Sequence, residues 1–417
     1  MVPMRHNTNF LSKMKKIVFL MMIILLPTTM LAQKKQLSQA RDILKEGKSP
    51  EKAEELMQEL LKDSANKENI KIWSTLFSAQ TMIYEQDNEK LFLKQEQDTM
   101  ALFDTAAKLF FTAQVIDTLE AQPDKKGRVI FRFRQHNSAY LNAIRPNLFN
   151  GGIYSINNDN PVKAISFLEQ YIDCSRQPLF QAYNYMNTDT RIPMAAYWAM
   201  YCSRKLGYDD DVLAYSIMAA ADTTHQDYIH QYRAEAFEHK GDTCSYVNEL
   251  RLGFEQFPMH SYFFPRLVEY YELLKRYDDA EKVVDKALSI DSTLILFRFA
   301  KSNICLNTQR YDECIILCDS IISEDSLLSD AYYNAGLAYF NKAIGVEKQL
   351  MKSKISKAQR RKFIENKETF YRQSLYYLET YRAMEPDKQK QWTVPLYTIY
   401  LNLNMGKEFE EIEKLMR

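Results

Sequence analysis

Two stretches decide the fold, because KRYDDAEKVVDKALSID at residues 275–291 and QRYDECIILCDSIISED at residues 309–325 share one pattern. Tyr277 matches Tyr311 and Asp291 matches Asp325, in each case with an offset of 34 residues. A fixed period of about 20 to 50 residues is typical of repeat architectures, in which each unit buries its apolar face against the next. The pattern therefore predicts a repeated structural unit.

This period resembles that of the tetratricopeptide repeat (TPR) family, whose unit is a helix, a turn and a second helix. In that family positions 8 and 20 are small and position 24 is large. Units start here near residues 145, 192, 227, 261, 295 and 329. Position 8 then holds Gly152, Ala199, Ala234, Val268, Ser302 and Gly336. Position 20 holds Ala164, Asp211, Tyr246, Ala280, Cys314 and, after an insertion, Ser374, and position 24 holds Leu168, Tyr215, Leu250, Val284, Cys318 and Leu378. The resemblance implies an all-α solenoid of antiparallel helix pairs in a right-handed superhelix over residues 145–386.

The repeat frame explains why a glycine stands inside the predicted helix AYYNAGLAYFNKA, residues 331–343. A glycine inside a helix costs about 1 kcal/mol relative to alanine. Gly336 falls at position 8, where two helices cross and only a small residue lets them close. Arg298 and Lys301 depart from the pattern, because apolar residues are usual at their positions, and Tyr246 is large where a small residue is usual. We expect these two repeats to pack irregularly or in a shifted register.

The rest of the chain fits the 34-residue frame less well, although its low content of 10 Gly and 12 Pro also favours helices. Residues 33–144 are expected to form degenerate helical pairs, with Ser49-Pro50 starting one helix and residues 103–117 lying in a long second helix. Residues 176–191 are predicted to be a loop, and residues 387–417 to form C-terminal capping helices.

Residues 1–32 have the pattern of a secretory signal peptide. Three lysines precede the apolar run 17–26, after which Pro27 and a small residue, Ala32, offer a cleavage point, and Met14 is an alternative start of translation. The run is short of the roughly 20 residues that span a bilayer, although a short membrane anchor is the competing interpretation. We expect an exported, periplasmic protein with Gln33 as its first residue and no stable membrane insertion after cleavage.

An insertion interrupts the last repeat. The period predicts the counterpart of Tyr311 at residue 345, but it stands at Tyr371, 26 residues later. Ser356 and Gln359 form a capping-box pattern that starts the second helix early. We therefore expect both helices to continue into a hairpin around residues 342–370. Residues 342–372 hold ten Lys or Arg and three Glu, including Arg360, Arg361 and Lys362. This basic finger is either a surface for an acidic partner or a solvated helix pair.

The sequence lacks the common motifs of catalysis and cofactor binding. It holds no HExxH, P-loop, GxGxxG or GxSxG motif, and its six His show no metal-ligand spacing. We expect no enzyme activity, metal or cofactor. The 54 Lys and Arg balance the 54 Asp and Glu, so nothing points to nucleic acid. Four of the six cysteines, Cys202, Cys305, Cys314 and Cys318, fall at interior repeat positions, and Cys305 with Cys318 is the pair to test for a disulfide in an oxidising compartment.

The first helices of such repeats line a concave groove that, in the TPR family, commonly binds peptides. The resemblance places ten residues in that groove, with tyrosine and arginine suited to binding hot spots and asparagine suited to pairing with a peptide backbone. They are Tyr197, Tyr228, Tyr232, Glu235, Arg266, Glu269, Asn303, Tyr333, Asn334 and Asn341.

Three functions remain open. The favoured one is a non-catalytic periplasmic scaffold that binds a protein or peptide through this groove. A glycan or cell-wall binding module is the alternative, since exposed tyrosines suit sugar rings. Glycan-uptake lipoproteins with this type of repeat fold carry an N-terminal cysteine, however, and this sequence has no cysteine before Cys174. An enzyme with an unrecognised site is the third.

Overall fold

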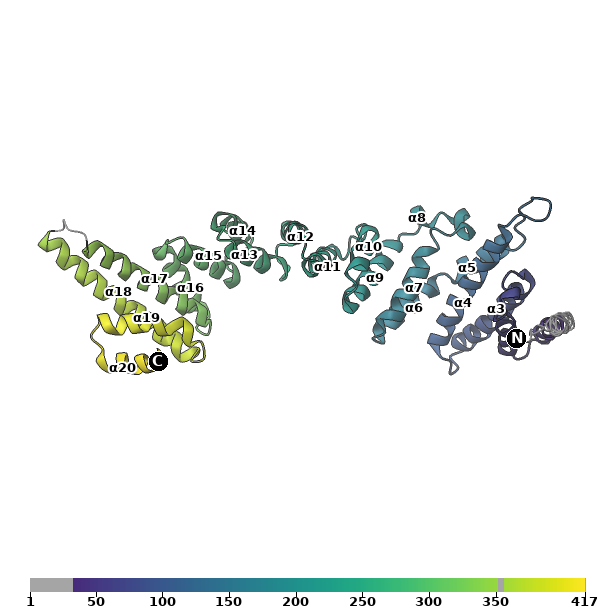
Figure 1. Cartoon of the computed structure of the whole chain (residues 1–417), viewed down its shortest axis with the longest axis horizontal. Helices are drawn as coiled ribbons and strands as arrows, with labels where there is room; N and C mark the ends of the chain where they lie inside the picture. Colours follow the sequence, from purple (N-terminus) through teal and green to yellow (C-terminus); the bar gives the residue numbers. More distant parts are fainter. Residues whose placement is uncertain (1–32, 352–355, 417) are drawn as a thin grey trace, which may run out of the picture. The chain divides into compact units, whose positions relative to one another are not determined.

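The computed structural model of the chain describes residues 33–351 and 356–416, and the predicted signal peptide lies outside them. Residues 33–46 form the first described helix. Helices joined by turns and loops follow to the C-terminal end, and no strand occurs within the two described ranges. The predicted all-α array of helix pairs is confirmed (Figure 1).

The chain divides into two compact bodies, one ending at Gly241 and the other beginning at Asp242. The N-terminal body contains α2 (Pro50–Leu61), η1 (Ser64–Asn66), α3 (Ile70–Phe92), α4 (Thr99–Glu120), α5 (Arg134–Ile144), α6 (Pro146–Asn157), α7 (Pro161–Asp173), η2 (Pro178–Tyr183), α8 (Tyr185–Thr188), α9 (Ile192–Leu206), α10 (Asp209–Ala219) and α11 (Gln226–His239). The C-terminal body contains α12 (Thr243–Gln256), α13 (Phe263–Leu273), α14 (Tyr277–Ile290), α15 (Ile295–Asn307), α16 (Tyr311–Glu324), α17 (Ser329–Leu350), α18 (Lys357–Met384), α19 (Gln389–Asn402) and α20 (Gly406–Met416). The division falls inside the repeat predicted to start near residue 227.

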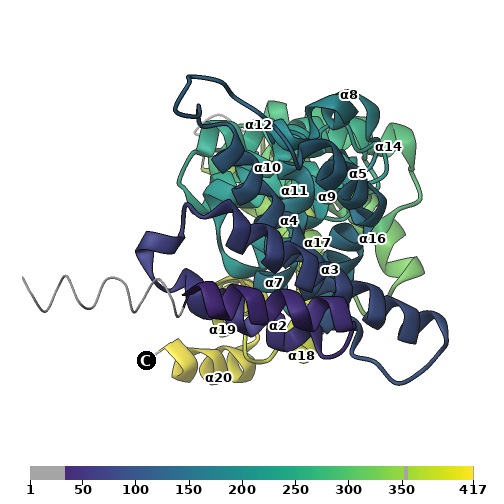
Figure 2. The ribbon, with the colours of Figure 1, turned by 90° about the vertical axis from the view of Figure 1, so that its right-hand side faces the viewer.

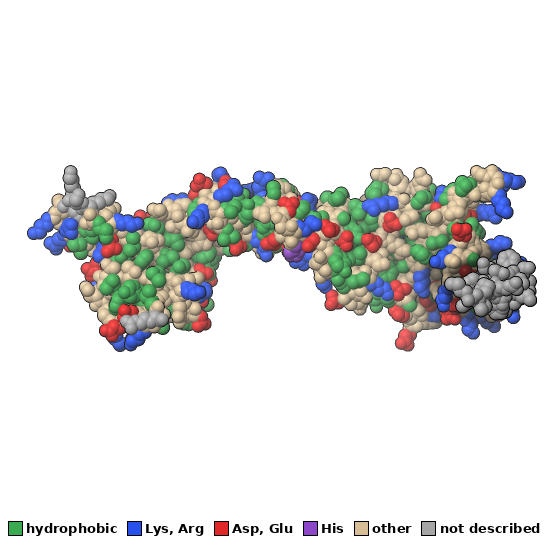
Figure 3. Space-filling model, in the orientation of Figure 1, with side chains coloured by type: hydrophobic (Ala, Val, Ile, Leu, Met, Phe, Trp, Pro, Cys, Tyr) green, Lys and Arg blue, Asp and Glu red, His purple; other side chains and the backbone are tan. Residues whose placement is uncertain are grey.

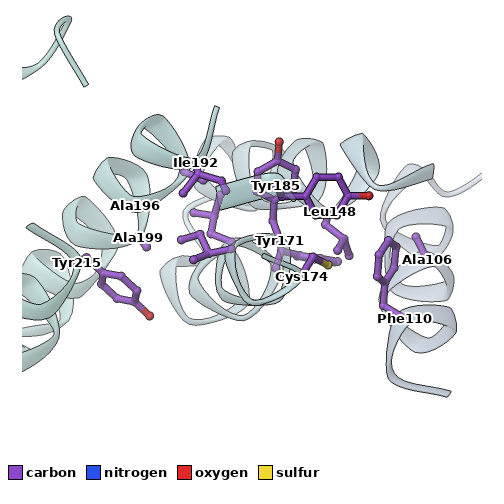
Figure 4. Close-up of a cluster of buried hydrophobic side chains, with 14 of the residues drawn as sticks. Ala106, Phe110, Leu148, Tyr171, Cys174, Tyr185, Ile192, Ala196, Ala199 and Tyr215 are labelled. Carbon is purple, nitrogen blue, oxygen red and sulfur yellow. The ribbon is translucent and has the colours of Figure 1, made fainter. Parts of the chain in front are cut away.

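Within each body, neighbouring helices pack in pairs. In the N-terminal body α2 packs on α3, α3 on α4, α6 on α7 and α9 on α10 (Figures 1 and 2). Its core is continuous from one pair to the next. Figure 4 shows Phe110 of α4, Leu148 of α6, Tyr171 of α7 and Ile192 of α9 in one buried cluster. Burial of this continuous apolar surface is the main favourable term for such a stack.

Position 8 is buried in all six predicted repeats. Gly152 lies against position 24 of its own repeat, so that a Cβ there would be 2.7 Å from Cγ of Leu168. Gly336 meets Leu378 in the same way. A Cβ essentially never comes this close to another carbon, and glycine is therefore what allows each pair to close.

The turn between the two helices of a repeat contains a residue in the left-handed region. Asp159, Gly241, Lys275 and Gln309 all stand at position 15 of their repeats and have positive φ, between 52° and 72°. In the repeat starting near 192 the left-handed residue is Gly207, one position later. The assignment of Asp211 to position 20 is therefore wrong. Asp211 is exposed, and the next residue, Val212, is 1% exposed and takes the inner place.

The segment predicted as a loop between repeats is ordered by a buried arginine. Residues 178–188 form the short helices η2 and α8. Arg145, 5% exposed, lies between the rings of Tyr171 and Tyr185, with its guanidinium carbon 3.8 and 3.9 Å from their centroids. It also pairs with Asp189, which accepts a hydrogen bond of 2.7 Å from the Tyr171 hydroxyl. The loop prediction is wrong here because these contacts join the segment to α6 and α7.

The repeat that starts near residue 295 packs in register, contrary to the expectation of irregular packing. Ser302 is fully buried at position 8, and α15 packs on both α14 and α16. The two basic residues at interior positions bury their stems and place their charges on neighbouring helices. Arg298 pairs with Glu324 of α16, and Lys301 pairs with residues of α14. Long basic side chains can therefore replace apolar ones at this contact.

The insertion forms the predicted hairpin. Helices α17 and α18 have 22 and 28 residues, against 11 to 14 in the helices of the two preceding repeats. The capping box is present, because the backbone N–H of Gln359 donates to Ser356 Oγ at 3.2 Å and the backbone N–H of Ser356 donates to Gln359 Oε1 at 2.9 Å. Further along α18, Ser374 is fully buried and its hydroxyl donates to the Gly336 carbonyl. The ends of the two helices that adjoin the repeats thus keep the repeat geometry.

Candidate functional site

The N-terminal body has an open cleft of about 810 Å³, which we call the lateral cleft. It lies across α2, α3, α4, α7 and α10, mostly on the second helices of successive pairs. Its lining residues are Gln58, Leu61, Lys62, Trp73, Leu76, Gln80, Ala107, Lys108, Phe111, Thr112, Ser166, Glu169, Gln170, Ile172, Asp173, Arg176, Tyr215 and Met218. None of them belongs to the groove predicted from the sequence.

One wall of the lateral cleft is aromatic. Two phenylalanines follow each other in α4, and adjacent residues of a helix point about 100° apart, so only one of them enters the core. Phe110 is fully buried, whereas Phe111 is 57% exposed. Trp73 of α3 meets the Phe111 ring edge to face, with centroids 6.4 Å apart, and its Nε1 donates to the Lys67 carbonyl at 2.8 Å. The indole is therefore held in place beside an exposed ring.

A hydrogen-bonded network forms the polar part of this wall. Glu54 of α2 accepts bonds from Gln58 at 3.0 Å and from Gln80 at 3.2 Å. Gln80 in turn accepts a bond of 2.8 Å from the Thr112 hydroxyl. Lys108 Nζ lies 3.4 Å from the same Glu54 carboxylate. The network joins α2, α3 and α4 and fixes the orientation of the Gln80 amide.

Another part of the lining comes from α7 and α10. Tyr215 donates a hydrogen bond of 2.7 Å to Glu169. Burial, reinforced by this carboxylate acceptor, raises the pKa of Tyr215 well above its usual value, so the hydroxyl stays protonated. Gln170 Nε2 donates to the Ala107 carbonyl at 2.9 Å. Arg176 is exposed at the edge, with a guanidinium nitrogen 3.7 Å from Sδ of Met218. The cleft thus carries aromatic, amide and charged groups of both signs.

The four predicted groove residues of the N-terminal body are largely engaged in packing. Tyr197 and Tyr232 are 4% and 5% exposed, and their rings stack with centroids 6.2 Å apart. The other face of Tyr197 stacks on His225 at 4.0 Å. Glu235 pairs with Arg204. Tyr228, at 42% exposed, is the one of the four with a largely accessible ring.

Six predicted groove residues belong to the C-terminal body. Asn334 of α17 is 5% exposed and donates to Ser302 Oγ at 3.2 Å and to Asn303 Oδ1 at 2.5 Å. The structure therefore brings the two asparagines together, but as a bond between α15 and α17. Tyr333 packs against Tyr381, with centroids 4.9 Å apart.

The remaining three residues of that set are more accessible. Arg266 and Glu269 are exposed on α13, and Asn341 is partly buried on α17. The Arg266 guanidinium carbon lies 3.9 Å from the centroid of the Tyr262 ring. It also donates to the Tyr262 carbonyl at 3.2 Å. Among the predicted groove residues of this body, Arg266 and Glu269 are the ones that solvent reaches most freely.

The basic finger presents its charge at the far end of the α17 and α18 hairpin, where blue side chains gather in Figure 3. Arg361 pairs with Glu365 of the same helix at 3.0 Å. Arg360 and Lys362 are exposed and form no ion pair with any residue that the structure describes. Their charges are therefore directed to solvent.

The cysteines and acidic side chains do not form a metal site or a disulfide. All six cysteines are free, including Cys305 and Cys318. Cys314 and Cys318 are buried against Ala335 and Ala338 of α17, as expected for small apolar residues. Over residues 33–351 and 356–416, no three side chains of His, Cys, Asp or Glu lie together as metal ligands would. In the same ranges, no helix is both long and apolar enough to span a bilayer.

Sequence reasoning missed the lateral cleft because its lining comes from residues between 58 and 218 with no shared period. One local signal was present. The pair Phe110-Phe111 lies on a helix whose core side is already occupied by Phe103, Ala106 and Phe110. Phe111 points away from that side. An aromatic residue at such a position is either exposed to solvent or packed against another helix.

Comparisons with known proteins find similar solved structures at low sequence identity. No protein-family model and no curated protein matches the sequence. A TPR protein from Parabacteroides merdae is 16% identical with a TM-score of 0.36, over 62% of this chain and 98% of that one. The C-terminal part of a TPR protein from Cytophaga hutchinsonii is 10% identical with a TM-score of 0.42, over 64% and 93%. A TPR protein from Bacteroides fragilis is 12% identical with a TM-score of 0.31, over 65% and 98%.

Proposed function

We propose that this TPR-like chain is a non-catalytic, exported scaffold that binds a protein or peptide, and that the lateral cleft is its binding surface. The observation that carries the proposal is the open cleft of about 810 Å³, in which an exposed ring stands beside hydrogen-bonding groups. Ligand sites in proteins commonly have volumes of about 300 to 1,000 Å³ and combine apolar walls with a few polar groups.

The chemistry of the walls favours a peptide. Gln58 and Gln170 use their amide nitrogens within the protein, which leaves their Oε1 atoms to accept bonds from a peptide backbone. Phe111 offers an apolar contact in the same cleft. The exposed Arg176 suits an acidic group on the same ligand.

Capture of proteins from exported fractions tests the cleft. The full chain and its Phe111→Ala variant serve as bait, and captured proteins are quantified by mass spectrometry. Phe92→Ala is the matched control, because Phe92 is 84% exposed on α3 and does not line the cleft. Loss of a hot-spot side chain costs about 1 to 3 kcal/mol, so Phe111→Ala should weaken binding of the partner by about fivefold or more while Phe92→Ala has no effect. Equal capture by wild type and Phe111→Ala contradicts the proposal.

A glycan or cell-wall ligand is the second candidate, favoured by the aromatic pair Trp73 and Phe111 in the same cleft as the Glu169 carboxylate. Sugar rings stack on aromatic faces, and their hydroxyls bond to carboxylates. The chain holds three tryptophans, so Trp73 contributes to intrinsic fluorescence. Soluble cell-wall fragments that change this fluorescence in wild type but not in Phe111→Ala would assign the cleft to glycans in place of peptides.

The groove predicted from the sequence is the competing surface for a protein partner. Tyr228→Ala and Arg266→Ala test it, one in each body, because these two side chains are exposed. If they lose the captured partner while Phe111→Ala retains it, the first helices of the repeats carry the binding site. Tyr232→Ala is unsuitable as a probe of binding, since Tyr232 is buried and its truncation destabilises the fold.

Export to the periplasm is tested on the native protein. Mass spectrometry of material purified from its source should find Gln33, or its cyclised form, as the first residue. Recovery of an intact chain starting at Met14 from the cytoplasm would contradict export.

A further inference from the structure

The loop between α4 and α5, residues 121–133, exposes three consecutive apolar side chains. Val129, Ile130 and Phe131 are 48%, 44% and 37% exposed. In Figure 1 this loop projects beyond the adjoining ends of α4 and α5. We call it the apolar loop. Isolated apolar residues are common on protein surfaces, but three in succession on a projecting loop are not.

Hydrogen bonds at both ends give the apolar loop a defined conformation. At the tip, Asp124 Oδ1 accepts from the amides of Lys126 and Arg128 at 2.8 and 3.0 Å, across Gly127 with φ of 74°. At the base, the buried Glu120 carboxylate accepts from the amides of Arg132 and Phe133 at 2.9 and 3.1 Å. The apolar residues are thus held in solvent by specific contacts rather than left there by a lack of structure.

The apolar residues are flanked by positive charge. Lys125, Lys126 and Arg132 are exposed and form no ion pair with any described residue. The nearby acids are already engaged. Asp124 pairs with Arg128 at 2.9 Å, and Asp117 of α4 pairs with Arg134. The surface that this loop presents is therefore apolar and cationic.

We infer that the apolar loop binds the surface of an anionic phospholipid bilayer. Val129 and Ile130 enter the boundary between headgroups and acyl chains, while Lys125, Lys126 and Arg132 contact lipid phosphates. Phe131 stays at the base, because the Arg134 guanidinium carbon lies 3.4 Å from its ring centroid. Apolar insertion combined with basic residues is the physical basis of peripheral membrane binding.

A lipid surface fits this loop because apolar and cationic side chains stand together on one short segment. Val129 and Ile130 are exposed, and the exposed Lys125, Lys126 and Arg132 lie close to them in the sequence. Apolar insertion and phosphate contacts can therefore occur together at one anionic membrane surface. The inference stands on different residues from the lateral cleft and does not depend on it.

Co-sedimentation with vesicles tests the inference on the full chain. The probes are vesicles of equal parts phosphatidylglycerol and phosphatidylcholine, and vesicles of phosphatidylcholine alone, at low and high salt. We expect binding to the first at low salt and little binding to the second. The double variant Val129→Ser/Ile130→Ser should lose this binding. Lys125→Gln/Lys126→Gln should weaken it about fivefold per lysine, since each cation near an anionic surface contributes roughly that factor.

Matched controls separate the loop from general surface properties. Val162→Ser/Ile217→Ser removes the same two residue types at positions 62% and 77% exposed in the same body. Lys48→Gln/Lys52→Gln removes two exposed lysines from the same body. Both control variants should bind anionic vesicles as wild type does. Wild type that fails to bind anionic vesicles, or loop variants that bind as wild type does, overturns the inference. Loop-dependent binding to a purified protein without any binding to vesicles overturns it as well and assigns the loop to a protein partner.

Discussion

Gly336 of α17 lies so close to Leu378 of α18 that a Cβ on the glycine would be 2.6 Å from Cγ of the leucine. Gly152 and Leu168 have the same relationship in the N-terminal body. In both repeats, therefore, position 8 of the first helix meets position 24 of the second. This contact sets how closely the two helices of a repeat approach each other.

Replacing Gly336 by leucine should lower the free energy of unfolding by about 2 to 4 kcal/mol, because the side chain must displace Leu378 or separate the helices. Chemical denaturation measures the change. Gly345 of the same helix is the control, since nothing lies within 4 Å of a Cβ placed there. Gly345→Ala should stabilise the protein by up to about 1 kcal/mol through helix propensity. A change below about 0.5 kcal/mol for Gly336→Leu contradicts the proposed role of this contact.

Gln309→Gly should stabilise the C-terminal body. Gln309 has φ of 65°, a conformation that costs a residue with a Cβ about 1 to 2 kcal/mol. Glycine avoids this strain but loses more entropy on folding, so we expect a net gain of about 0.5 to 1 kcal/mol in thermal or chemical unfolding. Lys282→Gly, inside α14, should instead destabilise by about 1 kcal/mol. Destabilisation by both variants would mean that the turn does not strain Gln309.

Two substitutions of Lys301 test whether its charge or its aliphatic stem stabilises the repeat. Its Nζ lies 2.5 Å from Glu281 and 2.6 Å from Asp285. Burial opposes the charge, but the hydrogen bonds that Lys301 donates to Asp285 and Glu281 outweigh this and raise the pKa of Lys301, so the ammonium stays charged. Lys301→Met keeps the buried stem and should change the free energy of unfolding by less than about 1 kcal/mol. Lys301→Ala should lower the free energy of unfolding by about 2 kcal/mol, because it also removes the buried stem. Equal losses in Lys301→Met and Lys301→Ala would mean that the ion pairs, and not the stem, stabilise the repeat.

Asp189 should make the N-terminal body sensitive to acid. Burial opposes its charge, but hydrogen bonds from Tyr171 and the Arg191 amide, together with Arg145, hold the pKa of Asp189 below its usual value. The stability that this carboxylate contributes is therefore complete above the unfolded pKa of about 3.9 and is lost as the pH falls through the lower folded value. Asp189→Asn should be less stable than wild type at neutral pH, and the difference should shrink on acidification below about pH 4. A difference that does not vary with pH contradicts this assignment.

Charge on the basic finger should affect how fast an acidic partner associates. Arg360→Gln/Lys362→Gln should slow association with the captured partner at low salt, with a smaller effect at high salt, because long-range attraction is screened. Lys390→Gln/Lys407→Gln, on α19 and α20, removes two other exposed lysines as a control. Stopped-flow or surface measurements of the association rate distinguish the variants. Equal rates for all proteins would mean that the finger is a solvated helix pair without a role in this encounter.

The sequence was sufficient for the packing of the repeats because the deciding interactions are steric and local to one unit. A small residue at position 8 requires a large neighbour, and the period reveals both. The capping box of Ser356 and Gln359 is equally local. Asp211 was misplaced because the turn at Gly207 shifts the following helix by one residue, a change that a constant period cannot show.

Exposure of the candidate site was harder to predict. Tyr232 and Asn334 stand at positions that the resemblance assigns to a groove, yet neighbouring helices cover them. Whether a helix position is covered depends on the spacing and rotation of the next pair, which the repeat pattern leaves open. The lateral cleft brings together helices separated by more than a hundred residues, and only the folded chain shows Phe111 beside Trp73.

The paired helices of the finger also have a mechanical consequence. The last turn of a repeat's first helix normally ends at a left-handed residue, but Ala343 stands at that position in α17 and the helix continues through it. Two antiparallel helices in contact along their length resist bending far better than a loop of equal length. We therefore expect the hairpin to act as a stiff lever, so that a force on its tip tilts α17 and α18 together and is transmitted to α19, which packs against them.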